Sequence, residues 1–231
     1  MTVGYELTES VATITLDDGK VNVLGPDMQA AINEALDRAE KDSAKAVVLA
    51  GNNRVFSGGF DLSVFQSGDP KAALAMLASG FELSVRCLTF PVPVFMAATG
   101  PAIAMGSFLL LSGDHRVGQP KTRCQAIEVA IGMTIPNAAL EIMRFRLTPA
   151  AFQRGAALAS TYVGDEAIAT GWLDEIVEAD RVVTRTQELA AEAASTLHTG
   201  AHLGTKLKAR ESALKAIRAG IDGLASEFTL G

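Results

Sequence analysis

The chain has 231 residues, of which 48% are hydrophobic and 20% are charged. This composition is typical of one globular domain, or of one domain with a small appendage. Twenty basic residues against 26 acidic residues give a formal net charge of −6, and Lys and Arg form no cluster. Because nucleic acids and anionic membranes bind basic surfaces, we expect neither as a partner.

Cysteine content and the N-terminal sequence indicate the compartment. Cys87 and Cys124 are too few for a disulfide framework in a chain of this length. The first ten residues contain neither the basic segment nor the apolar segment of a secretory signal. The longest apolar run, residues 101–111, is too short to cross a bilayer. We therefore expect a soluble cytoplasmic protein without a membrane segment.

Apolar runs alternate with amphipathic stretches through much of the chain. Residues 46–50 are all apolar and end at Gly51, which is typical of a parallel strand covered on both faces. Because strands alternate with helices, we predict an α/β fold with a parallel sheet. The predicted elements are strand 11–16, a helix after Pro26, strand 46–50, helix 70–88, strand 91–98, buried helix 101–112, helix 148–160 and helices within 183–219.

Two segments contain more Gly and Ser than packing alone requires: residues 56–62 (FSGGFDL) and residues 99–107 (TGPAIAMGS). Each follows an apolar strand, where free backbone N–H groups can point into a cleft at the carboxyl edge of the sheet. Two such groups aimed at one point form an oxyanion hole. Either segment alone would be read as a tight turn, but together they favour a catalytic cleft.

In this order, the two segments resemble those of the crotonase superfamily, the enoyl-CoA hydratase/isomerase fold. The family carries F-S-A-G-x-D-L and then G-x-A-x-G-x-G at these places. Three further segments resemble the family's CoA-contacting stretch, its second active-site loop and the helix and strand before its C-terminal helices: 20–28 (KVNVLGPDM), 126–136 (AIEVAIGMTIP) and 164–177 (GDEAIATGWLDEIV). The resemblance extends to about Val183.

The resemblance implies a ClpP/crotonase spiral of β-β-α repeats, followed by a helical C-terminal region. Residues 1–182 would form the core that binds acyl-CoA, and residues 183–231 a helical region for oligomerisation or capping. The implied assembly is a homotrimer or a dimer of trimers. The implied ligand is an acyl-CoA thioester, so that coenzyme A is part of the substrate and neither a separate cofactor nor a metal is expected.

The resemblance also assigns site residues. The backbone N–H groups of Gly58 and Met105 would be the two oxyanion donors. Asp61 would order the first loop, and Lys20 would contact CoA. The other positions implied to contact substrate are Val21, Phe56, Gly59, Leu62, Gly106, Phe108 and Pro136.

The departures from the family pattern suggest the reaction. Hydratases of the family carry two catalytic glutamates; Glu128 stands at one of these positions and Phe108 at the other. Pro136 follows Gly132 by four residues, a spacing similar to that of mitochondrial-type Δ3,Δ2-enoyl-CoA isomerases. One carboxylate can move a proton from C2 to C4, whereas addition of water is usually shared between two. We therefore favour isomerisation with Glu128 as the sole acid/base, its pKa raised by apolar neighbours.

Two alternatives keep the same ligand: an enoyl-CoA hydratase of fatty-acid degradation and a non-catalytic acyl-CoA-binding protein. Thioester hydrolysis or dehalogenation would need a carboxylate nucleophile, for which Asp69 and Glu141 remain as additional candidates. The C-terminal tail, Phe228–Gly231, would either cover the adenine of a neighbouring subunit's ligand or have no such role.

Two other readings have weaker motifs. The segment around Ser107 is similar to the nucleophile region of Clp-type serine peptidases, but Ser107 stands three residues after the position of the nucleophile, and His115 lies at the end of the same predicted helix. His198 and His202 have the i, i+4 spacing of metal ligands. No Cys or carboxylate lies near them in sequence, so we expect a solvent-facing pair.

Overall fold

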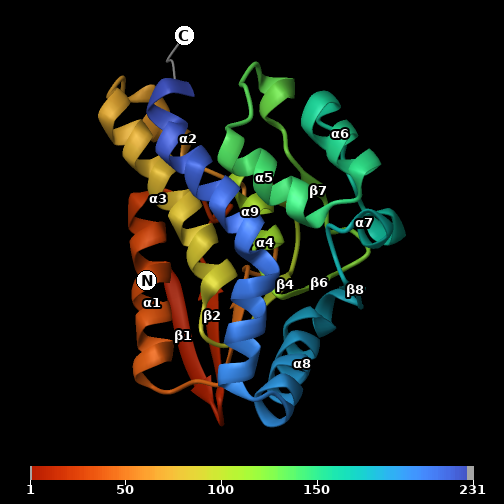
Figure 1. Cartoon of the computed structure of the whole chain (residues 1–231). Helices are drawn as coiled ribbons and strands as arrows, with labels where there is room; N and C mark the ends of the chain where they lie inside the picture. The colour runs from red at the N-terminus through yellow and green to blue at the C-terminus, as the bar shows by residue number, and fades with distance from the viewer. Residues whose placement is uncertain (1, 228–231) are drawn as a thin grey trace.

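The computed structural model describes residues 2–227, so the predicted roles of the tail Phe228–Gly231 lie outside the described residues (Figure 1). Its strands are β1 Val3–Thr8, β2 Val11–Leu16, β3 Ala46–Ala50, β4 Val94–Ala98, β5 Ala102–Ile103, β6 His115–Gly118, β7 Cys124–Gln125 and β8 Glu175–Ile176. Its helices are α1 Pro26–Lys41, α2 Leu62–Gln66, α3 Pro70–Thr89, α4 Met105–Leu111, α5 Asn137–Arg146, α6 Pro149–Leu158, α7 Gly164–Thr170, α8 Val182–Thr196 and α9 Thr199–Glu227, with 3-10 helices η1 Glu128–Ile131 and η2 Ala179–Arg181.

Within residues 2–227, six strands form the main sheet in the order β1-β2-β3-β4-β6-β8. The pairs from β2 to β8 are parallel, as predicted, and β1 pairs with β2 in antiparallel register, Val3 opposite Leu16. Strand β1 was not among the predicted strands, because its side chains are exposed or half-buried and show weak apolar alternation.

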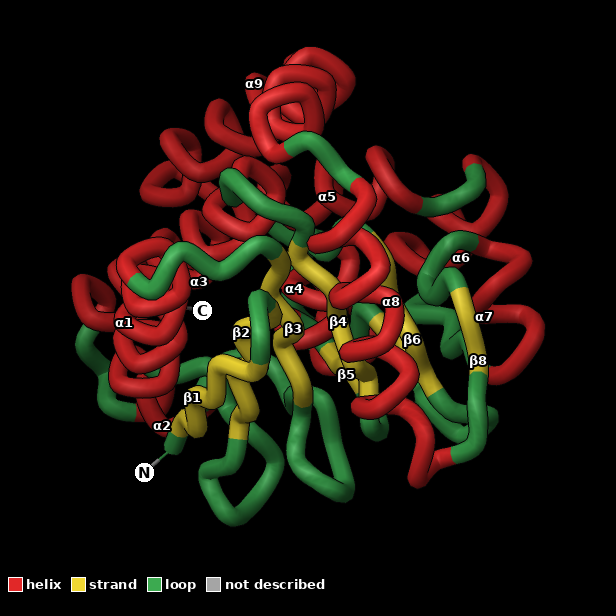
Figure 2. Tube along the Cα trace, turned by 90° about the horizontal axis from the view of Figure 1, so that it is seen from below, coloured by secondary structure: helices red, strands yellow, loops and turns green. Residues whose placement is uncertain are grey.

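Helices cover the sheet on both faces, which explains why β3 is wholly apolar. Ala46 and Val48 pack with Val182 and Ala190 of α8 on one face, while Val47 and Leu49 join α1 and α3 in the larger core on the other. Figure 2 shows α8 lying across the middle strands of the sheet. The buried stripe of α1 is Met28, Gln29, Ile32, Ala35, Leu36 and Ala39.

The predicted helix 101–112 is wrong in its first residues. Ala102 and Ile103 form β5, which pairs in parallel with β7, and α4 begins only at Met105. A short apolar run has no periodicity that separates a buried strand from a buried helix, so the sequence pattern merged the two elements. This break between β5 and α4 places the second Gly-containing segment at a turn.

The helical C-terminal region packs on the core of its own chain. Helix α9 runs along α3 and α5 (Figure 1). It crosses α5 at Gly220, where a Cβ atom would lie 2.4 Å from the backbone nitrogen of Ala138. At its end, Glu227 accepts hydrogen bonds from the backbone N–H and the side-chain amide of Asn137 (2.9 and 2.8 Å) and so caps α5. The four exposed N–H groups at a helix N-terminus favour such a carboxylate.

A buried ion cluster fastens the first half of α9. Asp114 accepts hydrogen bonds from Lys206 at 2.7 Å and from Arg210 at 2.6 Å, and both cations also donate to backbone carbonyls near the end of α3. Burial alone would raise the pKa of Asp114, but the two cations outweigh it and hold that pKa below its ordinary range. The carboxylate is therefore charged at neutral pH, and its contribution to stability is lost as the pH falls through the lowered pKa.

Helix α3 has the length and apolar composition of a membrane-spanning helix, and 56% of that stretch is buried inside the protein. Its buried residues include Leu77, Phe81 and Leu88, which belong to the main core.

Removal of the Asp114 charge should destabilise the protein strongly. Asp114→Asn leaves Lys206 and Arg210 buried without a counter-charge, and we expect a loss of about 3–5 kcal/mol in the free energy of unfolding, measured with denaturant. The matched control is Glu82→Gln, which breaks the exposed pair with Arg218 (3.4 Å) and should change stability by only about 0–1 kcal/mol. Equal small losses in both variants would contradict the role of the cluster.

Candidate active site

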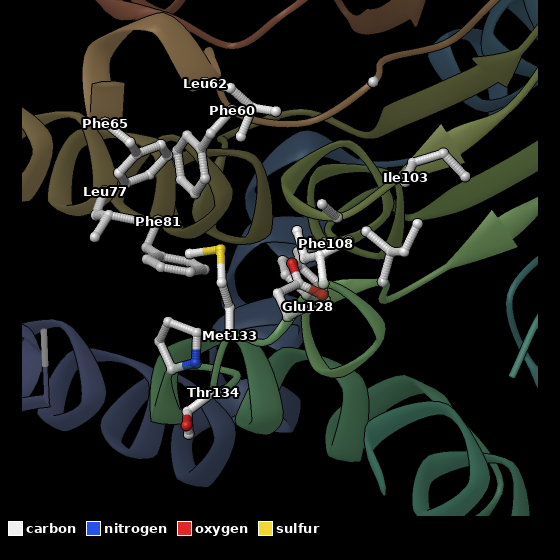
Figure 3. Close-up of a pocket in the computed structure, with 15 residues that line it drawn as sticks. Phe60, Leu62, Phe65, Leu77, Phe81, Ile103, Phe108, Glu128, Met133 and Thr134 are labelled. Carbon is white, nitrogen blue, oxygen red and sulfur yellow. The ribbon is translucent and has the colours of Figure 1, made fainter. Parts of the chain in front are cut away.

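A cavity of about 250 Å³ lies between the first Gly/Ser-rich segment, α3, α4 and the η1 segment. Its wall is mainly aromatic and aliphatic, and Glu128 contributes a carboxylate (Figure 3). Of the predicted site residues, Gly58, Leu62, Phe108, Glu128 and Pro136 line it.

Two backbone turns bring unpaired N–H groups to the same place. Gly59 has φ +98° and precedes Phe60; Ala104 has φ +51° and ψ −128° and precedes Met105. The N–H groups of Phe60 and Met105 have no hydrogen-bond partner within residues 2–227. A Cβ atom on Gly59 would lie 3.4 Å from the Met105 nitrogen, so the two turns are in contact. The Phe60 and Met105 amides are therefore the candidate donor pair.

The expectation that Gly58 supplies a donor is wrong. Its N–H group donates to the carbonyl oxygen of Val21 at 2.8 Å and is not free for a ligand. Residues 57–59 are bridged on both sides, Ser57 to Ala102 and Gly59 to Val23, and the N–H groups within such a paired segment are used internally. The first unpaired N–H comes where this pairing ends, at Phe60.

The conformation of Ala104 is held in place by its own carbonyl group. That oxygen accepts hydrogen bonds from the Ser107 N–H (2.8 Å), the Phe108 N–H (3.2 Å) and the Ser107 hydroxyl (2.7 Å). A non-glycine residue at such a φ costs on the order of 1–3 kcal/mol, and this kind of strain clusters at functional sites. Because Ser107 is fully buried and its hydroxyl is engaged here, the serine peptidase reading has no support.

Glu128 is the one ionisable side chain among the described residues that line the cavity. It begins η1, is 8% exposed, and its buried Oε2 has no hydrogen-bond partner. Burial raises the pKa of Glu128 to about 7, which confirms the predicted direction. The turn after η1 is closed by Gly132, at φ +80°, and by the Met133 N–H, which donates to the Glu128 carbonyl at 2.9 Å.

Aromatic rings form much of the cavity wall. Phe81 stacks on Phe108 with ring centroids 6.4 Å apart, and the ring of Phe60 meets Phe81 edge-on at 6.0 Å. Figure 3 shows Phe60 and Phe81 across the cavity from Glu128, and Phe108 beside Glu128. Phe108 was predicted here, whereas Phe81 and Leu77 were missed. On a buried helix they have the same spacing as ordinary core residues, so no sequence signal marks them as cavity lining.

The other predicted contacts have structural roles or remain predictions. Phe56 is fully buried in the core, and a Cβ on Gly106 would lie 2.5 Å from the Ser57 carbonyl oxygen. Neither lines the cavity, which corrects their predicted contact with substrate. Asp61 caps α2 by accepting hydrogen bonds from the N–H and hydroxyl of Ser63 (2.9 and 2.7 Å). Lys20 and Val21 are exposed, and Val21 is hydrogen-bonded to Gly58 of the first Gly/Ser-rich segment. Their contact with CoA stays a prediction.

The additional carboxylates do not reach the cavity. Asp69 is the N-cap of α3 and accepts hydrogen bonds from the N–H groups of Lys71 and Ala72. Glu141 pairs with Arg144 at 3.1 Å on α5. Neither lines the cavity. Asp69 and Glu141 therefore do not supply the carboxylate nucleophile that thioester hydrolysis would need.

The histidine pair is only half solvent-facing. His198 is exposed, but His202 is half-buried and its Nε2 atom is enclosed without a partner. Burial lowers the pKa of His202. Across residues 2–227, no three His, Cys, Asp or Glu side chains form a group that could hold a metal ion.

Comparisons with known proteins identify the family and the fold. Residues 6–222 match the family described as enoyl-CoA hydratase/isomerase. An enoyl-CoA isomerase structure from Mycobacterium tuberculosis is 54% identical, with a TM-score of 0.95 over 98% of this chain and 99% of that one. An enoyl-CoA hydratase structure from Mycobacterium marinum is 55% identical, with a TM-score of 0.96 over 99% and 100%. The peroxisomal enoyl-CoA delta isomerase 2 of Arabidopsis thaliana is 31% identical over 64% of this chain and 66% of its own length.

Because the pKa of Glu128 is raised, the difference in stability between the wild type and Glu128→Gln should depend on pH. A glutamate in an unfolded chain titrates near 4.3, whereas Glu128 in the folded protein titrates at about 7. The folded protein therefore binds this proton more tightly. The resulting stabilisation is complete below about pH 4.3, is lost as the pH rises to about 7, and amounts to about 4 kcal/mol. Glu128→Gln lacks this ionisation and should not show the loss.

The measurement is the free energy of unfolding of wild type and variant between about pH 4 and about pH 8. Glu82→Gln, which neutralises an exposed carboxylate, is the matched control. A difference between wild type and Glu128→Gln that is constant with pH would contradict the burial of an unpaired carboxylate.

Proposed function

The chain belongs to the enoyl-CoA hydratase/isomerase family, and we propose that it catalyses Δ3,Δ2-enoyl-CoA isomerisation. The observation that carries this proposal is Glu128, an unpaired carboxylate in an otherwise apolar cavity. The cavity is also lined by Phe60, whose N–H is free, and by Ala104, which precedes the free N–H of Met105. The substrate is an acyl-CoA thioester, and coenzyme A is part of that substrate.

The thioester oxygen accepts hydrogen bonds from the Phe60 and Met105 amides. Ionised Glu128 removes a proton from C2, and the charge that develops on the thioester oxygen is stabilised by these two donors. Protonated Glu128 then returns the proton to C4, and the double bond moves from C3–C4 to C2–C3. A group with a pKa of about 7 serves well in both directions, because base and acid forms are both populated near neutral pH.

The apolar wall disfavours hydration. A water molecule held for attack needs about two to four polar partners, and the phenyl ring of Phe108 stands where a second carboxylate is expected for a hydratase. Hydration is the second candidate function, because relatives of the family include hydratases as well as isomerases and Glu128 alone is the acid/base in both proposals. A non-catalytic acyl-CoA-binding protein is the third.

For the assembly we propose a cytoplasmic homotrimer or dimer of trimers. Val129, Ile131 and Leu158 are exposed apolar side chains on the η1 and α6 segments, and contact between subunits would remove such surface from water. Lys20 and Val21 remain the proposed contacts of the CoA portion.

Incubation with 3-enoyl-CoA and with 2-enoyl-CoA in deuterated water distinguishes these functions. We expect the two isomers to interconvert without formation of 3-hydroxyacyl-CoA, with part of the transferred hydrogen retained from the substrate. Glu128→Gln should lower turnover by at least about 100-fold, because it removes the acid/base, whereas Glu141→Gln on α5 should remain active. Hydroxyacyl-CoA would indicate a hydratase, and no turnover would indicate a silent binder.

The donor role of Met105 can be tested by removing its N–H group. Met105→Pro deletes this group at the first residue of α4, a position that accepts proline. Loss of one oxyanion donor should lower kcat by about 100- to 1000-fold. Met105→Ala loses the same buried side chain but keeps the N–H, and it separates packing from hydrogen bonding. Equal activity of the two variants would contradict the assignment.

A further inference from the structure

Gly80 lies in the middle of α3, where glycine is an unfavourable choice. Within a helix, glycine costs roughly 0.5–1 kcal/mol relative to alanine, so its place there calls for a packing reason. A Cβ on Gly80 would lie 2.5 Å from Cε1 and 2.8 Å from Cζ of Phe60, and 3.3 Å from the side-chain nitrogen of Gln29. The Phe60 ring therefore packs against the α3 backbone in the space that a side chain at position 80 would occupy.

The Phe60 ring is held from three sides. It rests on Gly80, and it meets the rings of Phe81 (6.0 Å, 79°) and Phe65 (6.4 Å, 81°) edge-on. Edge-to-face pairs at such distances are favourable. Together these contacts leave the ring little freedom to move.

The peptide group between Gly59 and Phe60 is held at its carbonyl, while its N–H is free. The Gly59 carbonyl oxygen accepts a hydrogen bond from the Leu24 N–H at 2.7 Å, whereas the Phe60 N–H has no hydrogen-bond partner within the described chain. Gly59 itself sits at φ +98°, a conformation that glycine adopts without steric cost. The contacts of the Phe60 ring position the Cα atom at the other end of this peptide group, so the direction of the N–H depends on the ring contacts together with the Leu24 hydrogen bond.

We infer that Gly80 is a positioning residue, which seats the Phe60 ring and thereby directs the Phe60 amide towards the thioester oxygen. The inference rests on the proposed function, since it concerns the same oxyanion donor. It adds that acyl-chain binding and carbonyl activation are coupled, because the Phe60 ring lines the acyl cavity while its amide contacts the reacting group. An α3 residue that touches no reacting atom thus affects the chemical step.

A double-mutant cycle tests this coupling. Gly80→Ala pushes the ring away, and Phe60→Leu removes the Cε1 and Cζ atoms with which the new methyl group would collide. In the wild-type background, Gly80→Ala should lower kcat by about 100-fold, as a displacement near 1 Å can, with little change in KM. In the Phe60→Leu background, the same substitution should have almost no further effect. Gly204→Ala is the matched control, because a Cβ on that α9 glycine meets no atom within 4 Å.

The direct measurement is the infrared stretching frequency of an enoyl-CoA labelled with ¹³C at the thioester carbonyl and bound to each variant. Hydrogen bonding in the wild type should lower this frequency relative to free substrate, and Gly80→Ala should move it back towards the free value. A lowered frequency that is unchanged by Gly80→Ala would overturn the inference alone. No lowering in the wild type would overturn the proposed oxyanion pair, and the inference with it.

Phe60→Leu provides a second test that does not depend on the folding of Gly80→Ala. It removes the anchored ring without adding atoms, so the carbonyl frequency should again move towards the free value. A frequency equal to that of the wild type would show that the ring does not direct the amide.

Discussion

The candidate active site is built around one electrostatic feature: a carboxylate is kept in an apolar cavity without a counter-ion. Desolvation of Glu128 raises its pKa to about 7, because burial disfavours the charged form and no cation nearby compensates. A buried ion pair would have lowered the pKa, as Lys206 and Arg210 do for Asp114. The same fold therefore produces two buried acids of opposite behaviour, one that remains ionised and one that can exchange a proton near neutral pH.

The second requirement is a pair of N–H groups that the protein does not use itself. Nearly all buried backbone donors are satisfied internally, so each free donor needs a local interruption of regular structure. Here the interruptions are Gly59 and Ala104, both at positive φ. Ala104 is strained, and its carbonyl hydrogen bonds hold it in that conformation. Stabilisation by such donors is effective because they are already oriented before the reaction.

The C-terminal helices contribute rigidity at a distance from the cavity. Helix α8 covers one face of the sheet, while α9 is fastened to the body of the chain by the Asp114 cluster and by the cap on α5. Helix α3 packs against α1, α4 and α9. Its Leu77 and Phe81 line the cavity, and its Gly80 contacts the Phe60 ring. Because α3 is packed on several sides, the surface on which the Phe60 ring rests has little freedom to move.

The α/β order and the two Gly/Ser-rich turns could be predicted from the amino-acid sequence, because strand and helix periodicity and turn residues are local signals. Glu128 was singled out through the resemblance of its segment to a known family. Tertiary structure decided which amide is free. The bridges of Ser57 to Ala102 and of Gly59 to Val23 join distant segments, and they engage Gly58 while leaving Phe60 unpaired. It also decided that Phe81 lines the cavity and that Phe56 does not, because whether an apolar side chain faces a cavity or the core depends on which elements pack against it.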